Sequence, residues 1–334
     1  MDNTQIIQFT FTDSEKNAIF KLLSEIIISP YQDYDNFISV VSDVVRNGNI
    51  PERFMVYCEN KRKEDERESP YTVFDNCPID IELPWLGFVN PVVEKRKLKK
   101  TYVAEGMLSI TAILFHQSPI GYINVNDGDV FQDIHPKDEL QNSQSQKALN
   151  EIFFHKDLAN HFVRPDWVNI LGLRNSKENM VYTCFSKNVD ILSKLSIATK
   201  SILTENLFHT PFDDLSMHKS HVKLGEADIH PVLGGSTLTD IRYFENRTKG
   251  INEIAERALL NLNQAIHDVK IPVFICPGLF MGAANNDCLH NKEIHKISNP
   301  EALKNRWLMK TVNVKSLEAH YKYFVPGRKN IVAG

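Results

Sequence analysis

Apolar positions recur at helical spacing through the first sixty residues. Thr12 and Glu15 have the spacing of a capping box, and apolar residues follow at intervals of three and four. A second amphipathic segment covers residues 37–45, and Gly48 is placed to end it. We therefore expect residues 1–60 to form a helical flank.

Shorter apolar runs, separated by turn signals, replace this pattern further along. Residues 58–78 are polar and irregular and predict a loop. From about residue 103 a buried helix or strand precedes β-type runs broken by Ser-Pro, Asn-Asp-Gly and His-Pro. The runs "DWVNILGLRN" and "NMVYTCF" predict adjacent strands joined by a polar turn.

Residues 188–266 interrupt these strands. A helical stretch and a loop rich in His, Asp and Gly occupy residues 188–232, and such a long irregular segment in a compact enzyme is typical of a lid. Residues 251–266 predict an amphipathic helix, and "VFICPGLFMGAANNDCLH" then predicts a strand, a Pro-Gly turn and a second strand. The expected apolar stripe of the helix is Ile251, Ile254, Ala258, Leu262 and Ile266.

The order of these elements favours one domain over residues 1–334. No β-α-β alternation, Gly-rich phosphate loop or internal repeat occurs, so a doubly wound nucleotide-binding sheet is not expected. The pattern favours a mainly β fold, a jelly-roll sandwich with flanking helices. We expect its core at about residues 84–316, with residues 188–266 as the inserted lid and helix.

Composition and charge narrow the range of partners. The 42% hydrophobic content supports a core, and a net charge of −4 gives no reason to expect nucleic acid. The charged runs at residues 61–68 and 94–100 predict solvated loops or helix faces. No stretch reaches the roughly 18 apolar residues of a membrane span, and no secretory signal is visible.

The cysteines favour a reducing compartment. Their number, five, is odd, and no C-x-x-C pair occurs, which argues against a disulfide framework and a zinc ribbon. We therefore expect a cytoplasmic protein.

His155 and Asp157 are the first candidates for chemistry. In a strand, residues two apart share a face, so an extended His-x-Asp directs an imidazole and a carboxylate to one point. A second histidine would complete a two-His-one-carboxylate iron site, and His290 is the best candidate because it follows an apolar strand. His295 lies in a charged stretch and is expected on the surface. Zinc in a hydrolase is an alternative, but no H-E-x-x-H helix supports it.

Such iron sites leave positions open for a 2-oxo acid, whose far carboxylate needs a buried cation. Arg306 lies in a strand-like run shortly after His290 and can pair with a carboxylate through two parallel bonds. Residue types and spacing alone leave open the simpler interpretation that these are ordinary polar residues of a β-rich domain.

Five blocks occur in order between about residues 84 and 316. They are "GYINVNDGDVFQDIHP", "SQSQKALNEIFFHKD", "RPDWVNILGLRN", "PGLFMGAANNDCLHNK" and "RWLMKTVNVKSL". In order and spacing these blocks resemble the clavaminate-synthase-like family of Fe(II)/2-oxoglutarate oxygenases, which includes asparagine oxygenase and arginine hydroxylases of natural-product pathways. The resemblance implies a double-stranded β-helix.

The resemblance also implies roles for particular residues. His155, Asp157 and His290 would bind Fe(II). Thr183 would hydrogen-bond the co-substrate 2-oxoglutarate, and Arg306 would pair with its distal carboxylate.

The implied substrate contacts depart from the family pattern. Gln146 lies where the family has a substrate-contacting Asn, and Glu245 matches a substrate-contacting acid in "RYFE". The Gln-Glu pair that holds a substrate amine in the family is here Asn124 and Val125. Lys310 replaces the arginine that pairs with the substrate carboxylate.

The implied reaction is hydroxylation of an unactivated carbon in a polar amino acid or an amino-acid-derived small molecule, with O2 as the oxidant. The carboxylate of Asp157 favours hydroxylation, although desaturation and cyclisation use the same chemistry. Because Val125 replaces the family's Glu, the same chemistry on a peptidyl, carrier-bound or modified amine compound is the alternative. A non-enzymatic β-sandwich binding module is a further alternative. Neither a nucleic acid nor a membrane is an expected partner, and the oligomeric state is left open.

Overall fold

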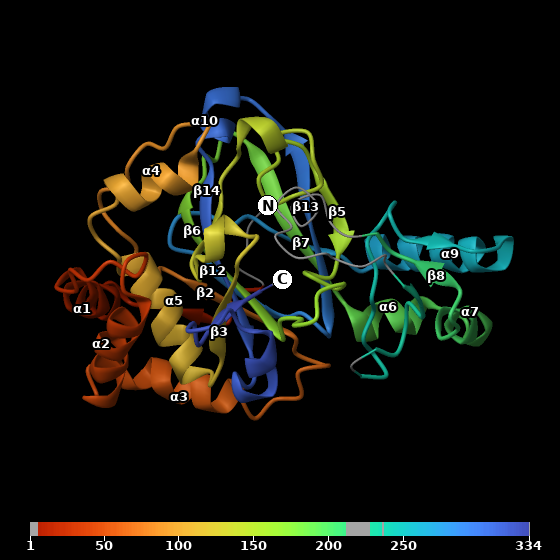
Figure 1. The fold of residues 1–334 in the computed structure, drawn as a ribbon, viewed down its shortest axis with the longest axis horizontal. Coiled ribbons are helices and arrows are strands. Elements are labelled where there is room, and N and C mark those ends of the chain that lie inside the picture. The colour runs from red at the N-terminus through yellow and green to blue at the C-terminus, as the bar shows by residue number, and fades with distance from the viewer. Residues whose placement is uncertain (1–5, 212–227, 236, 334) are drawn as a thin grey trace.

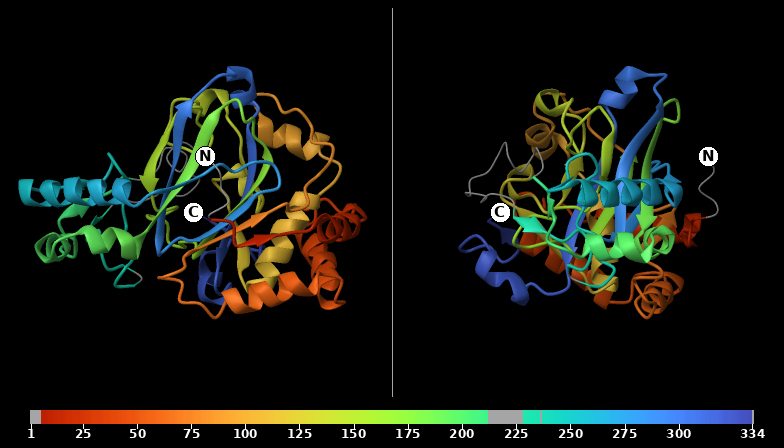
Figure 2. Two further views of the ribbon diagram at one scale, coloured as in Figure 1. Left: turned by 180° about the vertical axis from the view of Figure 1, so that it is seen from behind. Right: turned by 90° about the vertical axis from the view of Figure 1, so that its right-hand side faces the viewer.

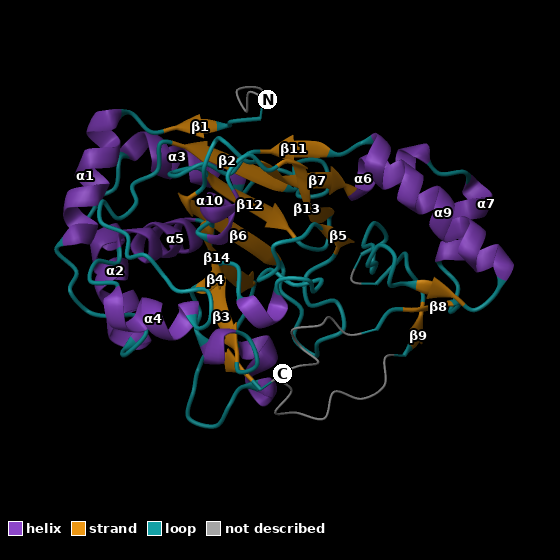
Figure 3. Cartoon of the chain, turned by 90° about the horizontal axis from the view of Figure 1, so that it is seen from above, coloured by secondary structure: helices purple, strands orange, loops and turns teal. Residues whose placement is uncertain are grey.

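Two β-sheets pack face to face at the centre of the molecule, and helices cover the outer face of each (Figure 1). This computed structural model describes residues 6–211, 228–235 and 237–333. Viewed from above, the sheets lie between two groups of helices (Figure 3). The order of layers is therefore helices, large sheet, small sheet, helices.

The large sheet has eight strands and the small sheet four. The large sheet follows the order β1-β2-β12-β6-β14-β3-β15, with β4 also paired to β14, and the small sheet follows β11-β7-β13-β5. The large-sheet strands are β1 (Phe9–Thr10), β2 (Tyr71–Asp75), β3 (Ser118–Tyr122), β4 (Gln132–Ile134), β6 (Trp167–Arg174), β12 (Phe280–Ala284), β14 (Trp307–Val314) and β15 (Ile331–Val332). The small-sheet strands are β5 (Ile152–His155), β7 (Met180–Lys187), β11 (Ile271–Val273) and β13 (Cys288–Lys296).

The helices fall into two groups along the chain. Those on the large-sheet side are α1 (Asp13–Ser24), α2 (Tyr34–Arg46), α3 (Glu52–Lys61), α4 (Pro91–Leu98) and α5 (Val103–Leu114). Those on the small-sheet side are α6 (Asn188–Lys194), α7 (Ile197–Leu203) and α9 (Glu253–Asp268), and α10 (Pro300–Lys304) precedes β14. None of the helices in the described ranges is long and apolar enough to cross a membrane.

The side chains of β6 alternate between the two faces of the large sheet, and each face packs against a different layer. Leu171 and Leu173 pack with the N-terminal helices, whereas Val168 and Ile170 pack between the sheets. Both faces of the strand are thus buried, which is why its sequence is nearly continuously apolar. With 33% helix and 23% strand, the chain is a mixed α and β protein. The expectation of a mainly β protein holds for the sandwich at the centre and is wrong for the chain as a whole.

The predicted N-terminal helices are confirmed. The Thr12 hydroxyl accepts a hydrogen bond from the Glu15 amide, and the Glu15 carboxylate accepts one from the Thr12 amide. Gly48 follows the end of α2 with φ of +71°, a left-handed conformation that suits glycine. The predicted loop at residues 58–78 is wrong in part, because β2 lies within it and pairs with both β1 and β12.

The prediction about strand pairing is also wrong, and the prediction about helix packing is wrong in part. β6 and β7 are strands, but they do not pair, since β6 pairs with β12 and β14 while β7 pairs with β11 and β13. On α9, Ala258, Leu262 and Ile266 of the predicted stripe are buried. Asn252 caps the amide of Ala255, so the helix starts at residue 253, and Ile251 and Ile254 at its N-terminal end are 56% and 64% exposed.

The predicted insertion forms an arm on the outer face of the small sheet (Figure 2). The arm contains α6, α7, α9 and a separate three-stranded sheet of β8 (Phe208–His209), β9 (Ile229–His230) and β10 (Lys249–Gly250). Residues 212–227 of the predicted lid loop lie outside the described residues.

The basic run at residues 94–100 contains two buried lysines, so the prediction of a solvated face is wrong there. Lys95 forms an ion pair with Asp133 at 2.7 Å, and Lys99 forms ion pairs with Asp80 at 2.8 Å and Glu105 at 2.7 Å. Burial alone would lower the pKa of Lys99, but the two carboxylates raise it. Paired carboxylates make burial of these ammonium groups possible.

Replacing Lys99 by Met should destabilise the protein by about 3–5 kcal/mol, because two buried carboxylates would lose their cation. The matched control is Lys100→Met, an exposed neighbour whose loss should change the free energy of unfolding by less than about 0.5 kcal/mol. Urea unfolding of the three proteins measures both effects. Equal effects of the two substitutions would contradict a structural role for the buried cluster.

Candidate metal centre

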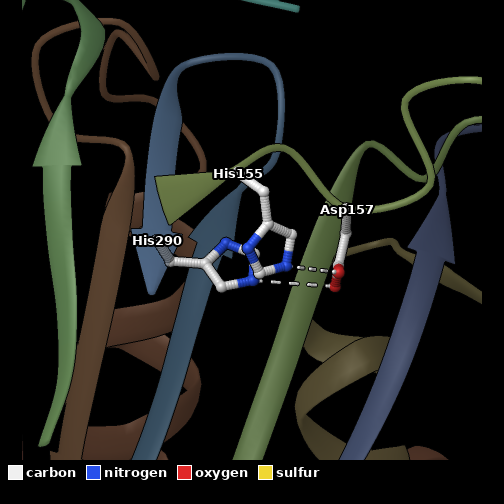
Figure 4. Close-up of side chains that lie close together, drawn as sticks. All are labelled: His155, Asp157 and His290. Carbon is white, nitrogen blue, oxygen red and sulfur yellow. Dashed lines mark ion pairs between the residues drawn. The ribbon is translucent and has the colours of Figure 1, made fainter. Parts of the chain in front are cut away.

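His155, Asp157 and His290 point toward one another between the two sheets (Figure 4). The Nε2 atom of His155 lies 3.4 Å from Asp157 Oδ1, and that of His290 lies 3.8 Å from Asp157 Oδ2. One potential ligand atom from each of the three residues lies within 4.8 Å of the ligand atoms of the other two. Ligand atoms on one face of an octahedral ion with bonds of about 2.1 Å are about 3 Å apart. A small inward movement of the three side chains would therefore bring their donor atoms to the distances that a bound metal ion requires.

Strand pairing brings the two histidines together. β13 runs antiparallel to β5, and His290 lies directly opposite His155 in the register. The Nδ1 atom of His155 lies 2.8 Å from the Phe153 carbonyl, which accepts its proton and leaves the Nε2 lone pair for a metal. The ring of His155 stacks on Phe244, and that of His290 stacks on Phe185. Both imidazoles are therefore held in place by their surroundings.

Asn285, which the sequence analysis did not identify, holds Asp157 in position. It lies in the turn between β12 and β13, where its side-chain oxygen accepts a hydrogen bond from the Asp157 backbone amide at 3.0 Å. Its amide nitrogen donates to the carbonyls of Asp157 and Pro165. The turn that leads to His290 thus also fixes the carboxylate ligand. An Asn-Asn turn is too common for the sequence to have indicated this role.

Asp157 is ionised although it is buried. Burial would raise its pKa, but the Lys310 ammonium and the hydrogen bond with His155 hold it well below the ordinary value. Lys310 Nζ donates to Asp157 Oδ2 at 3.0 Å. Burial, reinforced by His155, lowers the pKa of His290 to about 3, so this ring stays neutral. A neutral imidazole and a carboxylate are the forms that bind a metal ion.

A buried ion pair lies behind the His-x-Asp segment. Lys156 projects away from the two ligands and bonds Asp240 at 2.6 Å, and both side chains are fully buried. The Lys156 amide also donates to the Tyr243 carbonyl. Both contacts tie the ligand-bearing segment to residues 240–243 of the arm.

A pocket beside the three donors contains the residues predicted to bind the 2-oxo acid. Thr183 of β7 and Arg306, which directly precedes β14, both line it. Arg306 is 5% exposed, and among the residues that the structure describes its Nε has no hydrogen-bond partner and no carboxylate pairs with it. Burial lowers its pKa to about 10. A buried guanidinium without a counterion is costly, and an anionic ligand would relieve that cost.

Lys292, a second buried cation in the pocket, was not predicted as a site residue. Its Nζ donates to the carbonyls of Ala148 at 2.8 Å and Leu149 at 3.3 Å. Burial, with Arg306 nearby, holds its pKa well below the ordinary value.

The predicted substrate residues divide into two pairs. Gln146 and Lys310 line the pocket, and neither amide atom of Gln146 has a hydrogen-bond partner within the described ranges. Asn124 and Glu245 do not line it, although Val125, next to Asn124, does. The carboxylate of Glu245 instead accepts from the Phe154 amide at 3.0 Å and from His267 at 2.8 Å. The structure therefore does not bring Asn124 and Glu245 together with the other site residues.

The set of donors suits iron in a two-His-one-carboxylate site. Among the described residues, this cluster is the one group of His, Cys, Asp and Glu that could hold a metal ion. Two nitrogen donors and one oxygen donor leave three positions of an octahedral ion open. The exposed His295, predicted to be a surface residue, points to Glu293 and takes no part.

The fold and this geometry have counterparts among solved non-haem iron oxygenases. Asparagine oxygenase in complex with Fe(II), 2S,3S-3-hydroxyasparagine and succinate matches with a TM-score of 0.82 at 20% identity, over 98% of this chain and 99% of that one. The oxygenase OrfP in complex with Fe, succinate and (3S)-hydroxy-L-Arg matches with a TM-score of 0.78 at 18% identity, over 97% and 99%. The chain thus has the clavaminate-synthase-like Fe(II)/2-oxoglutarate oxygenase fold.

The sequence comparison agrees with this assignment of the fold. The chain is 23% identical to clavaminate synthase 2 from Streptomyces clavuligerus over 214 residues, which are 63% of this chain and 64% of that protein. The match thus spans just under two thirds of the length of that relative. No family model matches the chain.

Replacing His155 or His290 by Ala should weaken Fe(II) binding at least about hundredfold, because loss of a ligand costs more than loss of an outer hydrogen-bond partner. His295→Ala, which removes an exposed histidine of the same strand as His290, should leave the affinity unchanged. Anaerobic titration with Fe(II) measures all three. Normal iron binding by His290→Ala would disprove its role as the third ligand.

Asp240→Asn should destabilise the protein by about 3–5 kcal/mol, since Lys156 would lose its buried counterion. It should also weaken Fe(II) binding, because Lys156 lies between two ligands. The double variant Lys156→Met/Asp240→Asn removes both charges and should recover most of the lost stability in urea unfolding. Additive losses in the double variant would show that the two side chains act independently.

Proposed function

We propose that the protein is a non-haem Fe(II)/2-oxoglutarate-dependent oxygenase that hydroxylates an unactivated carbon of a polar amino acid or amino-acid-derived small molecule. The observation that carries this proposal is a single pocket with a two-His-one-carboxylate cluster and a buried, unpaired Arg306. A metal site and an anion site close together are what a chelating 2-oxo acid requires. We assign the sandwich of two sheets to the double-stranded β-helix class.

Each residue of the pocket has a distinct part in this proposal. His155, Asp157 and His290 hold Fe(II), Arg306 pairs with the distal carboxylate of 2-oxoglutarate, and Thr183 hydrogen-bonds it. Bound iron would supply the activation of dioxygen and the redox chemistry. In the overall reaction, 2-oxoglutarate loses CO2 and becomes succinate with one oxygen atom of O2, and the other atom enters a substrate C–H bond as hydroxyl.

The protein contributes position and shielding from water. Ile134, Ile170 and Leu308 supply apolar wall on the large-sheet side of the pocket, and Phe244 covers the ring of His155. Such a wall excludes water and restricts which substrate carbon approaches the metal. Gln146 and Lys310 are the described polar groups of the pocket that we assign to the substrate.

The same chemistry on a peptidyl, carrier-bound or modified amine compound is a second candidate. The observation that favours it is Val125, an apolar side chain in the pocket wall, next to Asn124. An apolar group at this position cannot pair with a substrate ammonium.

The test of the proposed activity is formation of succinate from 2-oxoglutarate under air. Succinate should form only when Fe(II) is added and should disappear in His155→Ala and after removal of the metal by a chelator. A protein that binds Fe(II) and 2-oxoglutarate but forms no succinate, either alone or with added amino acids and their peptidyl or amine-modified derivatives, would disprove the proposed activity.

Arg306→Met should raise the KM for 2-oxoglutarate about ten- to hundredfold with a smaller effect on kcat, because a charged, bidentate contact is worth about 1.5–3 kcal/mol. The matched control is Lys304→Met, which removes a half-exposed cation two residues away that pairs with Glu301. Steady-state kinetics at saturating O2 separate the two constants. An unchanged KM in Arg306→Met would exclude this residue as the 2-oxoglutarate anchor.

A further inference from the structure

A second cavity lies on the outer face of the large sheet, and the metal donors lie on the other side of that sheet. Thr72, Asn169, Gly282 and Trp167 belong to its wall, and we call it the outer cavity. Its volume is about 610 Å³, which is enough for a small organic molecule. Its described lining contains none of the residues assigned above to iron, 2-oxoglutarate or the substrate.

The outer face of the large sheet changes from apolar to polar along its strands. One row of facing residues packs under the N-terminal helices and is apolar: Phe74, Phe280 and Leu171. Two residues along the same strands, the facing row is polar or small: Thr72, Gly282 and Asn169. Helix α5 ends at Leu114, and residues 115–117, which follow it, line the cavity. The helical cover therefore gives way to a cavity with a polar floor.

Two side chains of this floor are buried and have unused hydrogen-bonding capacity. Asn169 is 2% exposed, and its Nδ2 donates to Gln117 Oε1 at 2.9 Å. Its Oδ1 lies over Gly282 and accepts no hydrogen bond within the described ranges. Thr72 is 9% exposed, and its hydroxyl has no partner in the described part of the chain. Since buried polar groups are normally hydrogen-bonded, both indicate a partner from outside the chain.

Carboxylates face the cavity from its other walls. Asp287 is 6% exposed, and its Oδ1 accepts a hydrogen bond from the Thr239 hydroxyl at 3.1 Å, which leaves Oδ2. Burial raises the pKa of Asp287. Glu66 Oε1 accepts a hydrogen bond from Trp167 Nε1 at 2.7 Å, which leaves Oε2. Burial of this carboxylate, with Asp287 and Asp166 nearby, raises the pKa of Glu66. A cation among these carboxylates would relieve their repulsion.

Most donor groups of the cavity wall already have partners. Asn286 Nδ2 donates to Asp166 at 3.4 Å, whereas its buried Oδ1 has no partner among the described residues. Lys61 forms an ion pair with Glu64 at 2.7 Å. The other lysine and arginine side chains of the lining are exposed: Arg62 and Lys315. The inner wall therefore offers a ligand mainly oxygen acceptors and negative charge.

We propose that the outer cavity is a binding site for a small organic cation, an amine or guanidinium compound. Its charged group would lie at Asp287 and Glu66, and Asn169 and Thr72 would accept its further hydrogen bonds. An ammonium or guanidinium group presents several donors and no acceptor, which matches a wall of free oxygen atoms. Because the large sheet separates this site from the metal donors, the ligand would not be the reacting substrate, and the proposal does not depend on the proposed function.

The probe for this site is agmatine, which carries an ammonium and a guanidinium and no carboxylate. Anaerobic calorimetric titration of the protein loaded with Fe(II) and 2-oxoglutarate measures its affinity and stoichiometry. We expect a single site, at which Asp287→Asn and Glu66→Gln each weaken binding about tenfold or more, because each removes the charge from a hydrogen-bond acceptor. Both substitutions keep the shape of the side chain, and thermal unfolding checks that each variant is folded.

Two further variants separate a specific site from general attraction. Thr72→Val keeps the shape of the side chain and removes its hydroxyl, so it should weaken agmatine binding about two- to tenfold. Glu68→Gln is the matched control, since it removes a negative charge at an exposed position of the same loop as Glu66. The affinity of Glu68→Gln should equal that of the wild type.

An absence of agmatine binding at millimolar concentration would overturn the proposal. Equal affinities of the wild type and Asp287→Asn would also overturn it, because the amine would then lie elsewhere. Equally tight binding of sorbitol, a neutral polyol, would show that the cavity does not select positive charge and has the same consequence. None of these results bears on the oxygenase activity, which succinate formation measures separately.

Discussion

The antiparallel pairing of β13 with β5 is the constraint on which the candidate metal centre depends. It sets His290 directly opposite His155, and the turn before β13 carries Asn285, which holds the backbone of Asp157. One strand and its preceding turn therefore orient three ligands from two distant parts of the sequence. A shift of one residue in this register would turn His290 toward the arm, because alternate residues of a strand face opposite sides.

Buried charge distinguishes the site from the supporting parts of the fold. Lys95, Lys99 and Lys156 are buried with carboxylate partners, and such pairs hold neighbouring segments in a defined arrangement. Arg306, at the wall of the pocket, is buried without a carboxylate partner in the described part of the chain. The fold thus buries a cation at a cost in free energy, and a bound anionic ligand would lower that cost. This contrast points to ligand binding more strongly than the residue type alone.

Local sequence was sufficient for several elements and supplied the candidate metal ligands. The capping box of Thr12 and Glu15 and the left-handed Gly48 depend on neighbouring residues only, and both are confirmed. The His-x-Asp spacing and the place of His290 at the end of an apolar run made three residues candidate ligands, the resemblance of the five blocks favoured them, and the structure brings them together. The stripe of α9 was right for Ala258, Leu262 and Ile266 and wrong at its N-terminal end, where the helix starts only after its cap at Asn252.

The sequence by itself determined the helical flank and the main strands of the sandwich, because period and residue type are local properties, and it supplied three candidate metal ligands. Only the tertiary structure decided which strands pair, which lysines are buried, and that Glu245 supports β5 and does not line the pocket. These outcomes depend on contacts between residues far apart in the chain. The energy of burying a charge or an amide depends on such partners, and no local pattern records them.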